Sequence, residues 1–349
     1  MKQSISIGIT TLTLACLTLP FAFAGAQAGD AAWNAAQALK AKAAYPQAAA
    51  AFEAWSAANS DAPRFPEGLT EAGVCWFSDG RSKLVLLRNS PESDAAFGKA
   101  LANFDRVLAL GASPYSARAQ YMRGSTKFFM DDMPGAEAEY TLVLDTWKAD
   151  LKYVPKALEK RASVYRNRLD TQAALADLRR YAKEFPTGPE IESVKTYTQR
   201  ALMFDKPAPP VTALSWIQGK PTSIAAERGE VVVLYFFATW CENCEKIRPF
   251  IIDLHKRYEP FNVRWIGIVD SSKGQTVESV RSFLVQNGIR FPVMMTDGSP
   301  ARTYGASGIP DAVLIDRAGN LRWNDNPNNL MDSTIEALLL TEPTPPADK

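Results

Sequence analysis

Two cysteines three positions apart, Cys241 and Cys244, stand where a strand-like segment gives way to a helix-like one. The run at 231–237 is apolar and precedes the pair, and the helical pattern starts at Glu245. A helix N-terminus offers free N–H groups and a partial positive charge, which both stabilise a thiolate. Two thiols held there can close a small disulfide and reopen it, so the sequence predicts thiol–disulfide chemistry at this junction.

The same spacing also occurs in zinc sites, in haem attachment and in structural disulfides. A four-ligand zinc site needs further Cys or His ligands; the chain offers Cys75, His255 and Cys16, which lies in a segment that we expect to be removed. Attachment of a c-type haem requires His directly after the second cysteine, where this chain has Glu245. A bridge between residues three apart constrains the unfolded chain little. Redox chemistry without a metal or cofactor is therefore the favoured interpretation.

Length and charge limit the class of protein. At 349 residues the chain is long for a single core, so two domains are expected. The formal net charge is +1, and the sequence contains neither a Walker motif nor a dinucleotide-binding glycine motif. These features give no indication of nucleic acid binding.

The N-terminus has the features of an export signal. Lys2 supplies a positive charge, residues 5–23 are mostly apolar, and small residues suited to cleavage follow at 22–24 and 26–28. We therefore expect a signal peptide over residues 1–28 and export to the bacterial periplasm, an oxidising compartment. An uncleaved N-terminal membrane anchor facing the periplasm is the alternative, because residues 5–23 are just long enough to span a bilayer.

Residues 29–204 are predicted to form a helical domain of repeated helix pairs. Three similar segments start at Ala102, Ala138 and Ala176, which are 36 and 38 residues apart. Arg123-Gly124-Ser125 likewise recurs 38 residues later as Arg161-Ala162-Ser163. A fixed period with two helices per unit is typical of helical solenoids, whose concave faces bind peptides or proteins.

This region resembles the tetratricopeptide repeat (TPR) family, whose unit of about 34 residues has small residues at fixed positions in both helices. The match is good over about residues 95–186 and poor over 31–94. A plain Ala-rich helical bundle is the alternative, and either arrangement indicates binding of a partner protein or peptide. Cys75, which has apolar neighbours, is expected to be a buried, inert thiol, with an intermolecular disulfide as the alternative.

The rest of the chain alternates between strand and helix patterns. A stiff Pro-rich linker is expected at 205–211, an α/β domain at 212–340 and a disordered tail at 341–349. The alternation predicts a central mixed sheet covered by helices. The expected strands are 231–237, 263–269, 291–296, 312–316 and 320–324, and the expected helices are 244–258, 276–288 and 328–340.

With these residues in place, the second domain resembles the thioredoxin fold over about residues 208–340. More narrowly, it resembles the exported thiol–disulfide oxidoreductases of the TlpA/ResA type. Residues 236–244 match the active-site turn of that family, and Pro249 stands where the fold kinks its active-site helix. Gly308-Ile309-Pro310, followed by a hairpin pattern, matches the segment that carries the cis-proline.

The resemblance implies a role for individual residues. Cys241 would attack a substrate disulfide, and Cys244 would resolve the mixed disulfide. Trp240 would shield the dithiol and offer an apolar docking surface. Pro310 would be cis and turn the backbone of Ile309 toward the sulfurs, where it can pair with an extended substrate peptide.

The departures from the family concern proton transfer. Thioredoxin has a buried acid six residues before the first cysteine, where this chain has Tyr235, and the TlpA/ResA type often has Glu where this chain has Ile247. Glu242 and Glu245 flank the thiols, but acids at a helix start are commonly solvated. A peroxidase of the peroxiredoxin class shares the fold but needs Thr or Ser where this chain has Ala238.

The favoured interpretation is an exported thiol–disulfide oxidoreductase, with reduction as the expected direction because exported relatives of this type are mostly reductants. Its partners would be protein thiols and disulfides, a redox protein that gives or accepts electrons, and an unknown protein on the helical domain. The alternative is a repeat-based scaffold with a degenerate or auxiliary thioredoxin-like domain. The missing internal acid favours that alternative, whereas the intact cysteine pair, Trp240 and Ile309-Pro310 argue against it.

Overall fold

The computed structural model describes residues 19–84 and 90–341, with side chains from residue 30 onward. Residues 1–18 of the expected signal peptide and 342–349 of the expected tail lie outside the described residues. In the described part of the chain, no helix combines the length and apolar character needed to cross a membrane.

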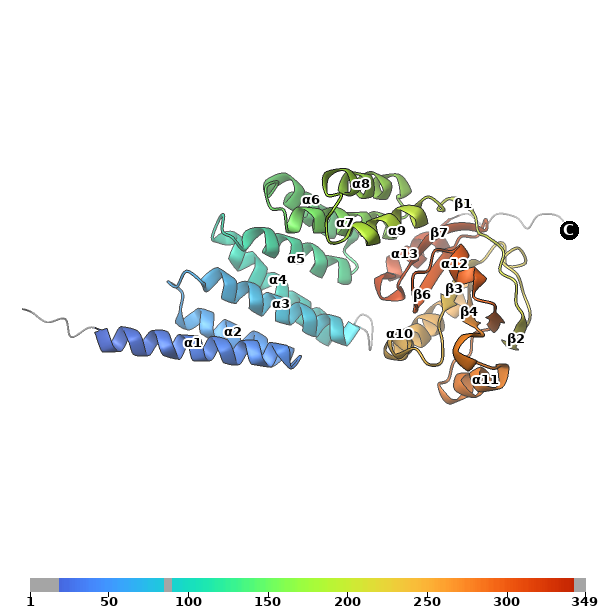
Figure 1. Ribbon diagram of the computed structural model, residues 1–349, viewed down its shortest axis with the longest axis horizontal. Coiled ribbons are helices and arrows are strands. Elements are labelled where there is room, and N and C mark those ends of the chain that lie inside the picture. Colours follow the sequence, from blue (N-terminus) through green and yellow to red (C-terminus); the bar gives the residue numbers. More distant parts are fainter. Residues whose placement is uncertain (1–18, 85–89, 342–349) are drawn as a thin grey trace, which may run out of the picture.

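The N-terminal region is helical, as predicted. Consecutive helices lie side by side and stack into an elongated array that leads to the α/β domain (Figure 1). The helices are α1 (Leu19–Ala41), α2 (Tyr45–Ala58), α3 (Phe65–Leu84), α4 (Pro91–Ala109), α5 (Ser116–Phe129), α6 (Met133–Thr146), α7 (Tyr153–Asn167), α8 (Thr171–Glu184) and α9 (Ile191–Ala201).

Close contacts between these helices depend on glycines that face aromatic rings. A Cβ atom on Gly73 of α3 would lie 2.5 Å from the ring of Phe104 in α4. A Cβ atom on Gly124 of α5 would lie 2.8 Å from the ring of Tyr140 in α6. Distances this short are repulsive in a close-packed interior, so a larger residue would force the paired helices apart.

Two consecutive helix pairs, α5–α6 and α7–α8, also share the geometry of their turns. Asp131 and Leu169, 38 residues apart, both adopt the left-handed backbone conformation, with φ of 61° and 60°. The residues that follow them, Asp132 and Asp170, cap the next helix by accepting a hydrogen bond from the backbone N–H three residues on. The correspondence that the sequence shows therefore extends to backbone conformation and capping.

The C-terminal region is an α/β domain built on a mixed sheet of order β1-β7-β6-β3-β4-β5-β2. Strands β3, β4 and β5 are parallel, and the other neighbouring pairs are antiparallel. β3 lies in the middle, and all of its residues are buried. The strands are β1 (Lys206–Pro207), β2 (Ser215–Gln218), β3 (Val231–Phe236), β4 (Val263–Asp270), β5 (Val293–Thr296), β6 (Asp311–Ile315) and β7 (Asn320–Asp325).

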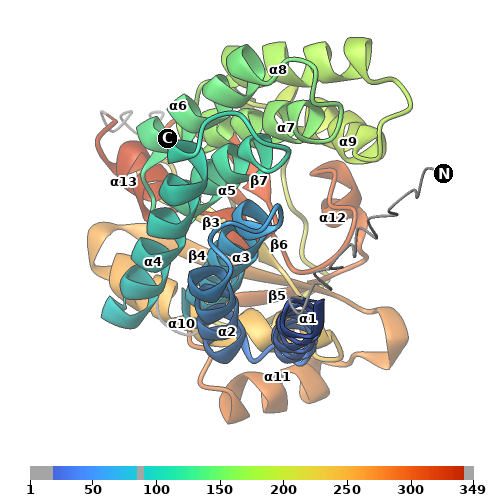
Figure 2. The ribbon, with the colours of Figure 1, turned by 90° about the vertical axis from the view of Figure 1, so that its left-hand side faces the viewer.

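Both faces of the sheet are covered. One face packs against α10, α11 and α13. The other packs against α12 and against the N-terminal region, so Leu158 and Val194 share an apolar cluster with Leu234 and Val313 of the sheet. The apolar core is therefore continuous between the two regions, which lie against each other in Figures 1 and 2. The helices of this domain are α10 (Glu242–Tyr258), α11 (Val277–Gln286), α12 (Ser299–Thr303) and α13 (Asp332–Leu339).

The expected strands and helices of this domain are present. Their ends fall within two residues of the prediction, except that the helix expected from residue 328 begins at Asp332 because Pro327–Asn329 forms a 3-10 turn. β1, β2 and α12 were not predicted. They have 2, 4 and 5 residues, which is too short for a periodic pattern to identify.

The segment predicted as a linker, 205–211, is partly a strand instead. The N–H of Asp205 donates to the carbonyl of Leu321, and the N–H of Ala208 donates to that of Gly319. The two residues between them form β1 and pair with β7 at the edge of the sheet. An edge strand tolerates proline because no ladder hydrogen bond is needed on its outer side. The connection is therefore fixed to the α/β domain.

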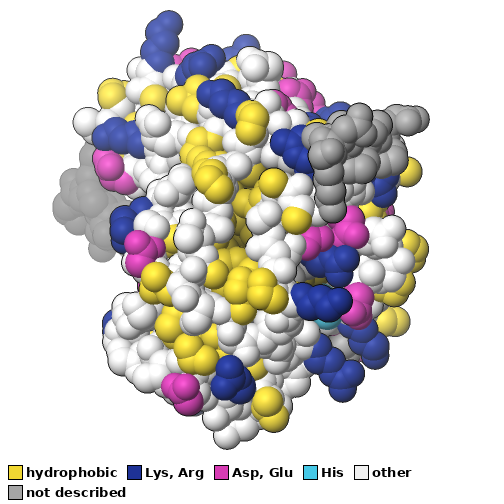
Figure 3. Space-filling view, turned by 90° about the vertical axis from the view of Figure 1, so that its right-hand side faces the viewer, with side chains coloured by type: hydrophobic (Ala, Val, Ile, Leu, Met, Phe, Trp, Pro, Cys, Tyr) yellow, Lys and Arg dark blue, Asp and Glu magenta, His cyan; other side chains and the backbone are white. Residues whose placement is uncertain are grey.

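The face of the molecule at the end distant from α1 carries mixed charge. Lys and Arg side chains alternate with Asp and Glu side chains along its edges, and hydrophobic side chains gather in its middle (Figure 3). This mixture agrees with the net charge of +1.

Candidate functional site

The central strand β3 leads directly to the cysteine pair. Its apolar residues suit a strand that is buried on both faces. Cys241 follows as the N-cap of α10, and Glu242 and Glu245 occupy the first turn, where acidic residues favour the start of a helix. The sequence therefore places two thiols at the carboxyl end of a central strand and the amino end of a helix.

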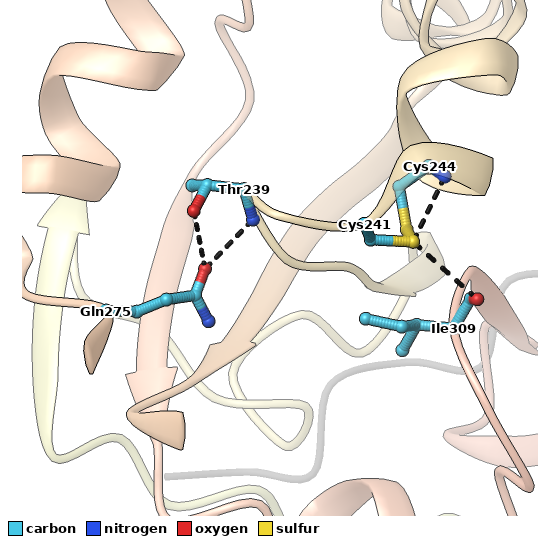
Figure 4. The surroundings of a disulfide bond; sticks show 5 residues. All are labelled: Thr239, Cys241, Cys244, Gln275 and Ile309. Atoms are coloured by element: carbon cyan, nitrogen blue, oxygen red, sulfur yellow. Dashed lines mark hydrogen bonds between the residues drawn. A yellow bond between two sulfur atoms is a disulfide. The ribbon is translucent and has the colours of Figure 1, made fainter. Parts of the chain in front are cut away.

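Cys241 and Cys244 form a disulfide in which the two Cα atoms are 5.2 Å apart. The side chains are 7% and 5% exposed. The backbone N–H of Cys244 donates to Sγ of Cys241 at an N···S distance of 3.1 Å (Figure 4). Because hydrogen bonds to charged acceptors are stronger than those to neutral ones, the same N–H would stabilise a thiolate on Cys241 after reduction.

The segment before β6 lies against this disulfide. The Ile309–Pro310 peptide bond is cis, as the resemblance implies. The carbonyl oxygen of Ile309 lies 3.7 Å from Sγ of Cys241 (Figure 4). Among the described residues, the N–H of Ile309 has no hydrogen-bond partner. The structure thus brings together the predicted Cys241, Cys244, Ile309 and Pro310, with backbone groups open beside the sulfur.

Trp240, the remaining predicted site residue, lies at the surface next to the disulfide. Its side chain is 43% exposed. Nζ of Lys273 lies 3.6 Å from the centroid of the Trp240 ring, a cation–π contact. The ring is therefore held by one neighbour and still accessible to a partner molecule.

Gln275 is a site residue that the sequence analysis missed. Its Oε1 accepts hydrogen bonds from the N–H and the hydroxyl of Thr239, at 2.9 and 3.0 Å (Figure 4). Its Nε2 donates to the carbonyl of Asp270 at 2.8 Å. These bonds tie the turn before Cys241 to the loop after β4. Gln275 is 36 residues from Thr239 in the sequence, and no local pattern identifies such a partner.

Among the described residues, the lining of the small void beside Cys244 contains a cation and no acid. The residues that line the small void beside it are apolar or aromatic, apart from the Arg248 guanidinium. Tyr235 in this lining is buried, and burial raises its pKa. The flanking Glu242 has an 80% exposed side chain, and a hydrogen bond from Lys246 lowers its pKa. The solvated position expected for this acid is therefore observed.

The third described cysteine, Cys75, is buried and free. Burial raises the pKa of its thiol to about 12, which keeps it protonated and unreactive at neutral pH. In residues 19–84 and 90–341, no group of three or more His, Cys, Asp and Glu side chains is placed to hold a metal ion.

Comparison with known proteins relates part of the chain to thiol–disulfide chemistry. A model of the AhpC/TSA family matches residues 204–324. The thiol-disulfide oxidoreductase ResA of Bacillus thuringiensis (strain Al Hakam) is 32% identical over 106 residues, which are 30% of this chain and 60% of that protein. ResA of Bacillus subtilis (strain 168) is 31% identical over 104 residues, 30% of this chain and 56% of that protein.

A solved structure of a thiol:disulfide interchange protein of the thioredoxin family, from Chlorobium tepidum TLS, is 27% identical. The match covers 38% of this chain and 95% of that one, with a TM-score of 0.34. This chain spans 60% of the length of the first curated relative that it matches. The C-terminal region is a thioredoxin-like α/β domain that has thiol–disulfide oxidoreductases among its homologues.

Proposed function

We propose that this protein is a thiol–disulfide oxidoreductase that works through a mixed disulfide on Cys241. One observation carries the proposal, a disulfide between Cys241 and Cys244 at the start of α10. In it, Sγ of Cys241 accepts a hydrogen bond from the N–H of Cys244 and lies 3.7 Å from the carbonyl oxygen of Ile309. The relatives named ResA support the same chemistry. Trp240 and Pro310 would complete the site, as a docking surface and as the residue that orients Ile309.

In the reductive direction, the Cys241 thiolate attacks one sulfur of a substrate disulfide. The substrate S–S bond breaks, a mixed disulfide forms, and the first substrate thiolate leaves and takes up a proton. Cys244 loses its proton and attacks Sγ of Cys241, which closes the protein disulfide and releases the second substrate thiolate. Two electrons pass to the substrate, and a dithiol redox partner restores the reduced protein.

We propose protein disulfides as substrates, reduction as the direction and the periplasm as the location. The export features of residues 1–28 support the location, and an N-terminal anchor facing the periplasm is the alternative. An exported reductant needs an electron supply from another redox protein, since the periplasm is kept oxidising.

We propose further that the helical region is of the TPR type and recruits a partner protein. The glycine–aromatic contacts between paired helices and the matching turns at Asp131 and Leu169 support a repeated unit. The alternative is a repeat-based scaffold with an auxiliary thioredoxin-like domain. The lining of the void beside Cys244, which contains no carboxylate, favours that alternative.

The midpoint potential of the Cys241–Cys244 couple tests the proposal. The protein is equilibrated in glutathione or dithiothreitol buffers, with Cys241→Ser as the blank. A midpoint potential of roughly −270 mV indicates a reductant, and a potential of roughly −120 mV indicates an oxidant. If no reversible couple is found, the proposed oxidoreductase activity is refuted, and the repeat-based scaffold becomes the better account.

A further inference from the structure

A cleft of about 350 Å³ lies between α9 of the helical region and the segment around Pro310. Ser193, Thr196 and Tyr197 of α9 form one wall, and Ile309 lies in the opposite wall. Figures 1 and 2 both show α9 beside α12 of the α/β domain. The volume lies in the range of ligand sites in proteins.

Buried ionic contacts hold the α9 wall in place. Arg200 donates to Asp311 at 2.7 Å and to the carbonyl of Gly305 at 2.8 Å, and the side chains of the ion pair are 3% and 5% exposed. The hydroxyl of Tyr197 donates to Asp325 at 3.4 Å. Since these contacts join α9 to both strands that border the cleft, the helical region is a fixed part of it.

Among the described residues that line the cleft, Asp311 has a hydrogen-bond acceptor without a donor. Asp311 lines the cleft and is 4% exposed, and its Oδ1 has no hydrogen-bond partner among the described residues. A buried carboxylate oxygen without a donor is costly, so a ligand that supplies an N–H would be favoured there. Ser193, Thr196, Ser307 and Asn326 add hydroxyl- and amide-bearing side chains to the lining of the cleft.

Ile309 connects the cleft to the disulfide. Ile309 lines the cleft, its carbonyl lies 3.7 Å from Sγ of Cys241, and its N–H has no partner among the described residues. A polypeptide whose cysteine reacts with Cys241, and whose backbone follows Ile309, therefore enters the cleft that α9 borders.

We propose that this cleft binds the extended polypeptide segment next to the reacting cysteine of a protein substrate, so that α9 selects protein disulfides over small-molecule disulfides. The inference rests on the proposed function. A small disulfide reaches Cys241 without touching α9, whereas a polypeptide places its backbone amides among the polar groups of the cleft. The helical region then takes part in substrate recognition at the reacting sulfur.

The test compares two disulfides as substrates of the pre-reduced full-length protein. Insulin serves as the protein disulfide and hydroxyethyl disulfide as the small one, and the second-order rate constant of reduction is measured for each. We expect Thr196→Trp, which fills the cleft, to lower the ratio of the insulin to the hydroxyethyl disulfide rate constant by about tenfold or more. Ser193→Trp, at an exposed position on the same wall, is expected to lower it in the same direction.

Gln199→Trp is the matched control, because Gln199 is exposed on α9 and does not line the cleft. It should leave the ratio unchanged. The inference is overturned if both cleft variants keep the wild-type ratio, or if Gln199→Trp lowers it equally. A wild type that reduces only hydroxyethyl disulfide overturns the inference and the proposal of protein disulfides as substrates, and leaves the thiol–disulfide oxidoreductase chemistry standing. A wild type that reduces neither disulfide overturns both.

Discussion

The buried ion pair between Arg166 of α7 and Asp325 at the end of β7 joins the helical region to the α/β domain. The two side chains are 2% and 4% exposed. Without Asp325, the Arg166 guanidinium keeps two contacts. Nη2 lies 3.4 Å from Ser163 Oγ, a long hydrogen bond, and Cζ lies 4.1 Å from the centroid of the Tyr197 ring. Nη1 of Arg166 has no hydrogen-bond partner among the described residues even in the wild type. Replacement of Asp325 by Leu therefore leaves a charge in the interior.

Removal of one partner from such a pair costs about 3–5 kcal/mol of unfolding free energy. Asp325 also accepts hydrogen bonds from Tyr197 at 3.4 Å and Asn329 at 3.2 Å, each worth about 1 kcal/mol. We therefore expect about 5–7 kcal/mol for Asp325→Leu and about 3–5 kcal/mol for Arg166→Met. The double variant leaves no unpaired charge and should cost only about 2 kcal/mol, the contribution of the two lost hydrogen bonds.

A double-mutant cycle measures this coupling, with unfolding in urea followed by circular dichroism and tryptophan fluorescence. The control is the exposed pair Arg180–Glu184 of α8, whose side chains are 41% and 42% exposed. Glu184→Gln should change the unfolding free energy by less than about 0.5 kcal/mol. Additive effects of the two single variants, or a loss below about 1 kcal/mol for Asp325→Leu, would refute the reasoning.

Three further outcomes are expected. Gly73→Ala places a Cβ 2.5 Å from the Phe104 ring and should destabilise the protein by about 1–3 kcal/mol. In Gly98→Ala the new Cβ meets no atom within 4 Å, so this variant should be more stable than the wild type by about 0.5–1 kcal/mol. Unfolding in urea measures both changes. Cys75, whose pKa burial raises to about 12, should resist iodoacetamide at pH 8 in the native protein, and labelling as fast as in urea would contradict this. Burial raises the pKa of Asp311 from 3.8 to about 6, so the folded state binds this proton more tightly and loses stability as pH rises between those values. Relative to Asp311→Asn, the wild type should lose about 2–3 kcal/mol between pH 4 and pH 7, and parallel pH profiles would show that Asp311 is not the cause.

The α/β domain could be predicted from the sequence because its signals are local. The apolar run of β3, the adjacent cysteines and the segment Ile309-Pro310 each occupy a few consecutive residues. Gln275 and Lys273 could not be identified in this way. They reach Thr239 and Trp240, just before Cys241, from a loop after β4, and those contacts depend on tertiary placement, which no periodicity encodes.

The packing of the helical region on the α/β domain could not be predicted from the sequence either. The prolines of 205–211 predict a stiff linker between separate domains, but β1 joins the sheet and Leu158 of α7 shares the core with Leu234 of β3. Arg200 has no sequence feature that distinguishes it from a solvated arginine on α9. Its role follows only from the position of Asp311, which is 111 residues further along the chain.

The docked helices limit how the role of the helical region can be tested. A recruiting module on a flexible tether would act only by raising the local concentration of its ligand, and could be removed without harm to the enzyme. Here its removal would expose the apolar sheet face around Leu234 and Val313, and would take Arg166 and Arg200 from two buried aspartates. We therefore expect residues 205–341 alone to aggregate or unfold, which light scattering and urea unfolding would detect. A truncation would confuse loss of stability with loss of recognition, whereas substitutions on the exposed side of α9 separate the two.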